Sequence, residues 1–210
     1  MFIQVCFTYY QWTINPAEAT SIYLTHWGVF FTTMSLVFSL QASETHIETF
    51  GMLPDKTLAM LLMQVAGSLN FLITLVSWTI IIPANLARKR PFDDNEGVVY
   101  MINKVAVHTL PFVFSSVNMF GLTNMTAYFR DTWVLFPVMA GYMTLAYTYT
   151  KASGHHIYDF LTFDFSDYYQ IGLIAGAPFV FLLGHAVDCV VTQAVTGRYE
   201  YDYGRWFGFE

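Results

Sequence analysis

Thr25 and His108 are the two residues whose types and surroundings could do chemistry together. Thr25 lies in the segment IYLTHWG and His108 in INKVAVHTLPF, and both segments are otherwise rich in apolar residues. A threonine hydroxyl becomes a useful nucleophile only when a base accepts its proton, and a buried neutral imidazole is such a base. The pair would then form a two-residue acyl-transfer centre. Spacing alone leaves another interpretation open, in which the hydroxyl bonds back to its own helix and the histidine bridges helices structurally.

Five long apolar stretches must position these residues. Four of them are close to the roughly 20 residues that a helical membrane crossing requires, and residues 57–84 are longer than a bilayer requires. They cover residues 23–41, 57–84, 98–121, 132–150 and 169–192. A further apolar segment, residues 1–14, is too short to span as a straight helix. We therefore predict an all-α protein, a polytopic transmembrane helix bundle of five full crossings with a short N-terminal apolar segment.

The composition limits the classes of protein to which the chain can belong. Hydrophobic residues make up 55% of the 210 residues and charged residues only 11%, against roughly a quarter charged in soluble domains. We expect residues 1–210 to form one integral membrane domain with membrane lipids as partners. The net charge is −6, and the nine Lys and Arg form no long basic stripe, so nucleic acid is not an expected partner. No phosphate-binding loop or Cys-x-x-Cys pair is present, and we expect no cofactor and no metal.

The predicted crossings allow Thr25 and His108 to meet. If the first and third crossings start on the same side of the membrane, they run parallel. Thr25 is then a few residues inside and His108 about ten residues inside. At ~1.5 Å per residue this corresponds to depths of ~5 to 12 Å and ~15 Å, respectively. Two side chains at these depths can face each other across a bundle.

Three neighbouring residues could support the pair. His26 directly follows Thr25 and would either tune the site or anchor the chain at the interface beside Trp27. Lys104 lies one turn before His108, where its charge would favour the neutral imidazole, unless the side chain extends to lipid headgroups. Asn103 and Lys104 are also candidate donors to an oxyanion.

Three motifs resemble those of a known family. IYLTHWGVFFTTMSL, VHTLPF and SGHHIYDFLTFDF occur in the same order and at similar intervals as motifs of the androgen-inducible membrane protein family. That family includes the androgen-dependent TFPI-regulating protein and is related to the rolling stone group. The resemblance covers about residues 23–189. Asp159, in the sequence YDFL, stands where the family usually has proline, and the N-terminal helix of the family is shortened here to residues 1–14.

The resemblance implies a multi-pass threonine hydrolase of fatty acid esters of hydroxy fatty acids. Thr25 matches the nucleophile and His108 the catalytic histidine of that family, and the implied location is the endoplasmic reticulum or plasma membrane. A second interpretation is a non-catalytic accessory or structural subunit of a larger membrane complex, for example a respiratory one. Its partners would then include other membrane subunits, and the mitochondrial inner membrane would be the expected location. The aromatic interfacial segments and short loops suit this second interpretation.

Overall fold

The computed structural model describes residues 23–43, 56–87, 95–122, 126–158 and 160–197. For some helical residues, most of them near helix ends, it describes only the backbone: 41–43, 56, 57, 85, 95–101, 103, 104, 121 and 122. The N-terminal segment predicted at residues 1–14 and Asp159 both lie outside the described residues. Within the described ranges the protein is helical and forms no strand, which confirms the all-α class.

The helices follow the apolar stretches of the sequence and end where polar residues or glycines interrupt them. The first are α3, Leu24–Ser43, and α4, Lys56–Val76, which continues through the π-helix η2, Ser77–Ile81, into α5, Ile82–Ala87. Next come α6, Asn95–Val117, with its π-helical end η3, Asn118–Leu122, and the 3₁₀ helix η4, Phe129–Val134. The last are α7, Leu135–Ser153, and α8, Tyr168–Thr196.

Local capping explains where α7 ends and where α8 begins and ends. α7 stops at Gly154, whose φ of 71° is a left-handed conformation that glycine adopts without steric cost. The side chain of Asp167 accepts a hydrogen bond from the Tyr169 N–H over 2.9 Å and so caps the start of α8. Gly197, with φ 66°, ends α8 in the same way as Gly154 ends α7. The caps at Gly154 and Asp167 fix the two ends of the loop that joins α7 and α8.

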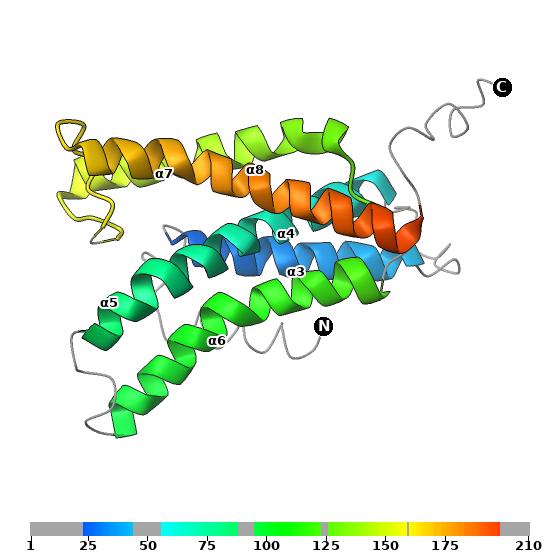
Figure 1. Ribbon diagram of the computed structural model, residues 1–210, viewed down its shortest axis with the longest axis horizontal. Helices are drawn as coiled ribbons and strands as arrows, with labels where there is room; N and C mark the ends of the chain where they lie inside the picture. The colour runs from blue at the N-terminus through cyan, green and yellow to red at the C-terminus, as the bar shows by residue number, and fades with distance from the viewer. Residues whose placement is uncertain (1–22, 44–55, 88–94, 123–125, 159, 198–210) are drawn as a thin grey trace.

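The helices form a bundle around α4, which contacts α3, α6 and α8. In Figure 1, α3, α6 and α8 run in one direction and α4 and α7 in the other. α7 and α8 lie side by side along one edge of the bundle, while α5 and the first half of α6 diverge from them. The start of α3 and the loop between α7 and α8 therefore lie at the same end of the molecule.

Two glycines allow the central helices to approach closely. A Cβ atom at Gly28 in α3 would lie 2.5 Å from Asn70 Oδ1 and 2.6 Å from Ile73 Cδ1. A Cβ atom at Gly67 in α4 would collide with the Asp188 carboxylate of α8. Small residues at helix interfaces are typical of membrane helix packing, because they let backbones come close. α3 and α8 are thereby both held close to α4.

The prediction of five crossings is not supported. Two described helices are long and apolar enough to cross a membrane, Leu58–Ala84 and Tyr168–Thr196. The apolar runs of α3 and α6 cover only Leu24–Leu40 and Val105–Phe120, which are shorter than the roughly 20 residues of a full crossing. In α7, threonines and tyrosines interrupt the apolar sequence. The two apolar helices indicate association with a membrane, without defining which membrane.

Candidate functional site

The structure brings Thr25 and His108 together. Thr25 Oγ1 lies 3.2 Å from His108 Nδ1, and both side chains are buried. Thr25 belongs to the first turn of α3, whereas His108 lies well inside α6. When the threonine donates this hydrogen bond, Nδ1 is the acceptor and the proton of the neutral ring resides on Nε2. In that tautomer the imidazole can accept the threonine proton.

Two hydrogen bonds hold the His108 turn of α6 against the end of α4. Thr74 Oγ1 donates to the main-chain oxygen of His108 over 2.8 Å. One turn later, Trp78 Nε1 donates to Thr109 Oγ1 over 3.2 Å. Because these bonds act on consecutive residues of α6, they fix both the height and the rotation of the helix that carries the imidazole.

Asn70 joins the three helices around the pair. Its Nδ2 donates to Thr32 Oγ1 of α3 over 2.6 Å and to the main-chain oxygen of Pro111 in α6 over 3.2 Å. It also lies 3.4 Å from Ser115 Oγ of α6. A single amide of α4 thus sets the spacing between the helix of Thr25 and the helix of His108.

Tyr158, in the loop between α7 and α8, completes the hydroxyl cluster around Thr25. Its hydroxyl accepts a hydrogen bond from the Leu24 N–H over 3.1 Å, so it satisfies a main-chain donor that the start of α3 leaves without an intrahelical partner. Its side chain is also hydrogen-bonded to Tyr142 and Thr25, and burial raises the pKa of the Tyr158 phenol above its ordinary value. Tyr158 is therefore a neutral hydroxyl that orients the threonine.

A cavity of ≈ 270 Å³ lies beside the pair, close to the lower end of the ~300 to 1,000 Å³ typical of small-ligand pockets. Its wall is formed by the start of α3, the end of α4 with η2, His108 of α6, the middle of α7, the first half of α8, and Tyr158, Phe160 and Leu161 of the loop between α7 and α8. Most of the lining side chains are apolar. The polar members of the lining are Thr25, Ser77, Thr79, His108, Tyr142 and Tyr158. The cavity can therefore accept an apolar chain next to a hydroxyl and an imidazole.

The other predicted site residues have different outcomes. His26 is partly buried, packs its ring edge-on against Tyr23 with centroids 6.2 Å apart, and is not part of the cavity lining. The side chains of Asn103 and Lys104 lie outside the described residues, so their predicted support of the site stays a prediction. Sequence reasoning gave no role to Tyr142 or Ser77. For Tyr158, its position in the YDFL motif was the available signal.

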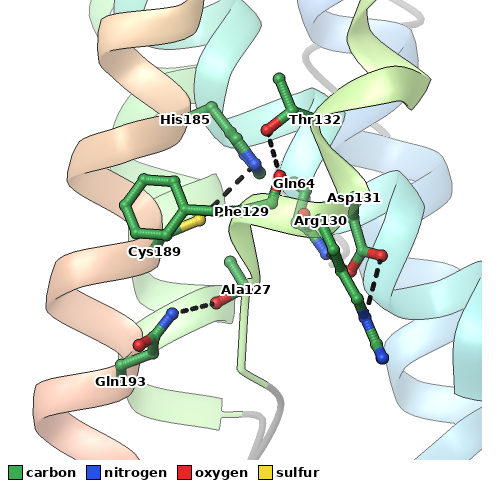
Figure 2. A network of polar contacts seen from close by, with 9 residues as sticks. All are labelled: Gln64, Ala127, Phe129, Arg130, Asp131, Thr132, His185, Cys189 and Gln193. Carbon is green, nitrogen blue, oxygen red and sulfur yellow. Dashed lines mark hydrogen bonds and ion pairs between the residues drawn. The ribbon is translucent and has the colours of Figure 1, made fainter. Parts of the chain in front are cut away.

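A second polar cluster lies around His185 in α8. The Sγ of Cys189 is 3.5 Å from His185 Nε2, and the ring of Phe129 packs edge-on against the imidazole with centroids 6.4 Å apart (Figure 2). His185, Cys189 and Phe129 do not line the cavity beside Thr25. Within the described ranges, no group of three or more His, Cys, Asp or Glu could hold a metal ion. The contact between His185 and Phe129 packs η4, which begins at Phe129, against α8.

The same region is tied to α4 and α8 by amide side chains. Gln64 Nε2 of α4 donates to Asp131 Oδ2 over 3.2 Å, and Gln193 Nε2 of α8 donates to the main-chain oxygen of Ala127 over 3.2 Å (Figure 2). Arg130 Nε lies 3.5 Å from the other carboxylate oxygen of Asp131. These bonds fix the entry into α7, and so help to place the α7 wall of the cavity.

No family model matches the chain, and no curated protein or solved structure matches it either. The chemistry of the site is therefore argued from its geometry. A buried hydroxyl within hydrogen-bonding distance of an imidazole is the arrangement of a nucleophile and its general base.

Proposed function

We propose that the protein is a threonine-type carboxylic ester hydrolase that acts on lipid esters in the membrane. The observation that supports this most strongly is the 3.2 Å contact between Thr25 Oγ1 and His108 Nδ1 at the wall of a largely apolar cavity. The motif resemblance to the androgen-inducible family points to the same two residues. A hydroxyl and a base in contact can divide ester cleavage into two easier steps.

In the first step, Thr25 Oγ1 attacks the ester carbonyl carbon while His108 Nδ1 accepts the hydroxyl proton. The carbonyl electron pair moves to oxygen and forms the tetrahedral oxyanion. When that pair returns, the bond to the alcohol oxygen breaks, and the imidazolium protonates the departing alkoxide. Water, deprotonated by His108, then cleaves the acyl-threonine ester and releases the carboxylic acid, which restores the threonine hydroxyl.

The cavity determines which esters fit. Its apolar wall favours an aliphatic acyl chain, because burying such a chain removes apolar surface from water. Both of the helices that are able to cross a membrane contribute to the wall, α4 through Leu72 and Ile73, and α8 through Ile174 and Val180. A lipid chain bound in the cavity would therefore contact both of these helices. We propose fatty acid esters of hydroxy fatty acids as the substrate class.

The test is an assay of the purified full chain in lipid nanodiscs with such an ester. Thr25→Ala and His108→Ala are expected to reduce kcat by roughly 10³-fold or more, as removal of a nucleophile or base does in other acyl-transfer enzymes. Thr148→Ala and His155→Ala, at exposed positions away from the cavity, serve as matched controls that keep wild-type turnover. Equal turnover in Thr25→Ala and wild type contradicts the proposal.

A second candidate function is that of a structural membrane subunit. The observation that favours it is the exposure of large apolar side chains on η4, α7 and the following loop, among them Trp133 at 64%, Phe136 at 57% and Phe165 at 58%. Such a surface suits contact with a protein partner as well as with lipid. Purification in mild detergent distinguishes the two functions. A stoichiometric complex whose activity is unchanged by Thr25→Ala and His108→Ala supports the subunit.

A further inference from the structure

Ser77 presents a buried hydroxyl that the mechanism above does not use. Ser77 is 1% exposed, and its Oγ has no hydrogen-bond partner among the described residues. It lines the same cavity as Thr25 and His108. An unpaired hydroxyl in an apolar interior costs stability. A ligand oxygen in the cavity would supply the missing partner.

Neighbouring helical hydroxyls are satisfied differently. Thr32 donates to the main-chain oxygen of Gly28 over 2.7 Å, and Thr79 to that of Leu75 over 2.7 Å. This bond to the carbonyl four residues earlier is the usual solution for serine and threonine inside a helix. Ser77 does not make it, although Thr79 does so only two residues later. Its hydroxyl is thereby left available to a group from outside the helix.

The backbone at Ser77 is also unusual. Ser77 opens the π-helix η2, and its main-chain oxygen accepts a hydrogen bond from the N–H of Ile82, five residues later. Single π-helical turns inside α-helices occur frequently at functional sites. In α4 this turn begins where the helix reaches the cavity.

Two bonds place Ser77 on the turn that faces His108. Thr74, three residues before it, donates to the main-chain oxygen of His108, and Trp78, immediately after it, donates to Thr109. Ser77 is thus carried by the short part of α4 and η2 that is fixed against the catalytic turn of α6. Thr25 and Ser77 line the same cavity, so an ester carbonyl engaged by Thr25 would lie in a space that Ser77 also borders.

From this placement we propose that Ser77 donates a hydrogen bond to the carbonyl oxygen of the ester that Thr25 attacks. The inference rests on the proposed hydrolase function and assigns the oxyanion donor of that reaction. As the carbonyl electron pair moves to oxygen, the Ser77 hydroxyl keeps its proton and its hydrogen bond to the oxygen strengthens. A donor of this kind contributes most when it is already buried and needs no reorganisation.

The experiment compares Ser77→Ala with Thr150→Val. Both substitutions remove a buried hydroxyl that has no hydrogen-bond partner among the described residues, but Thr150 does not line the cavity. Ser77→Ala is expected to reduce kcat roughly 10² to 10³-fold, the usual effect of losing one oxyanion donor. Thr150→Val should keep wild-type kcat. Neither variant should have a lower melting temperature, because each removes an unsatisfied polar group.

The outcomes separate this inference from the proposed function. Loss of turnover in Thr25→Ala with full turnover in Ser77→Ala overturns the role of Ser77 and leaves the hydrolase intact. If the wild type has no esterase activity, the proposed function fails. The role of Ser77 is then tested by measuring ligand binding. A labelled fatty ester is then compared with the matched ether, which lacks the carbonyl. Weaker binding of the ester alone in Ser77→Ala supports the contact, and equal effects on both ligands, or none, overturn it.

Discussion

The main-chain N–H of Leu24 donates a hydrogen bond to the hydroxyl of Tyr158 over 3.1 Å and so joins the start of α3 to the loop between α7 and α8. The two residues are 134 positions apart in the sequence. Because Thr25 directly follows Leu24, this bond also fixes the turn that carries the proposed nucleophile.

Tyr158→Phe removes the acceptor of the Leu24 N–H and the hydroxyl bonded to Thr25. A lost buried hydrogen bond is expected to lower the free energy of unfolding by about 1 to 2 kcal/mol. We also expect a lower kcat with little change in KM, because Thr25 is held less well while the cavity stays apolar. Denaturant unfolding and steady-state assays measure both effects. Tyr168→Phe, at a position that is 89% exposed, is the control, and identical behaviour of the two variants would refute the role of Tyr158.

Alkaline pH should destabilise the fold through Tyr158. Burial raises the pKa of the Tyr158 phenol above its ordinary value of 10.0. The unfolded chain therefore loses this proton at a lower pH than the folded protein does. The free energy of unfolding that the neutral Tyr158 phenol contributes is fully present below pH 10 and decreases as the pH rises further. Unfolding free energies measured between about pH 9 and 11 should fall less steeply in Tyr158→Phe than in the wild type. Parallel curves for the two proteins would contradict a contribution of Tyr158.

Asn70→Ala is expected to affect stability and activity together. The substitution removes the amide that bonds Thr32 of α3 and Pro111 of α6. Each lost hydrogen bond is expected to lower the free energy of unfolding by about 0.5 to 1.5 kcal/mol. Turnover should decrease because the spacing between Thr25 and His108 is no longer fixed. Asn118→Ala is the matched control, since Asn118 bonds Ser35 and Ser39 further along α3. A greater loss of activity in the control would contradict this account.

Gly67→Ala tests the close approach of α4 and α8. The added methyl group would meet the Asp188 carboxylate and lie 2.7 Å from Met119 Cε. Overpacking of this kind costs about 1 to 3 kcal/mol. At Gly141 in α7 the nearest atom to a new Cβ is Trp27 Cη2 at 4.0 Å, so Gly141→Ala should be neutral or stabilising by up to about 1 kcal/mol, the difference in helix propensity. Equal melting temperatures of the two variants would show that α4 and α8 are not packed as described.

Helix positions followed from the sequence because polar loops interrupt the apolar stretches. The stretch at residues 98–121 corresponds to α6 and η3, which together cover residues 95–122. The number of membrane crossings could not be predicted from the sequence in the same way, because the helices α3 and α6 extend beyond their apolar runs. Helical structure continues through polar residues, whereas a membrane crossing requires sustained apolarity.

The candidate site was predictable only in part. Thr25 and His108 attract attention because both are chemically capable residues in apolar surroundings. The contacts of Tyr158 with Leu24 and of Ser77 with the cavity depend on packing between distant helices. Neither residue type is unusual at its position, and hydroxyl residues occur at many other helical positions in this chain. Local patterns therefore identify the reactive pair more readily than the groups that position it.

The most direct test of the central claim is mass spectrometry of the full chain quenched during turnover of a fatty ester. Attack by Thr25 predicts a transient acyl adduct on the peptide that contains Thr25. The adduct is absent in Thr25→Ala and forms far more slowly in His108→Ala. Ester hydrolysis by the wild type without any adduct on this peptide, together with full turnover in Thr25→Ala, would contradict the account.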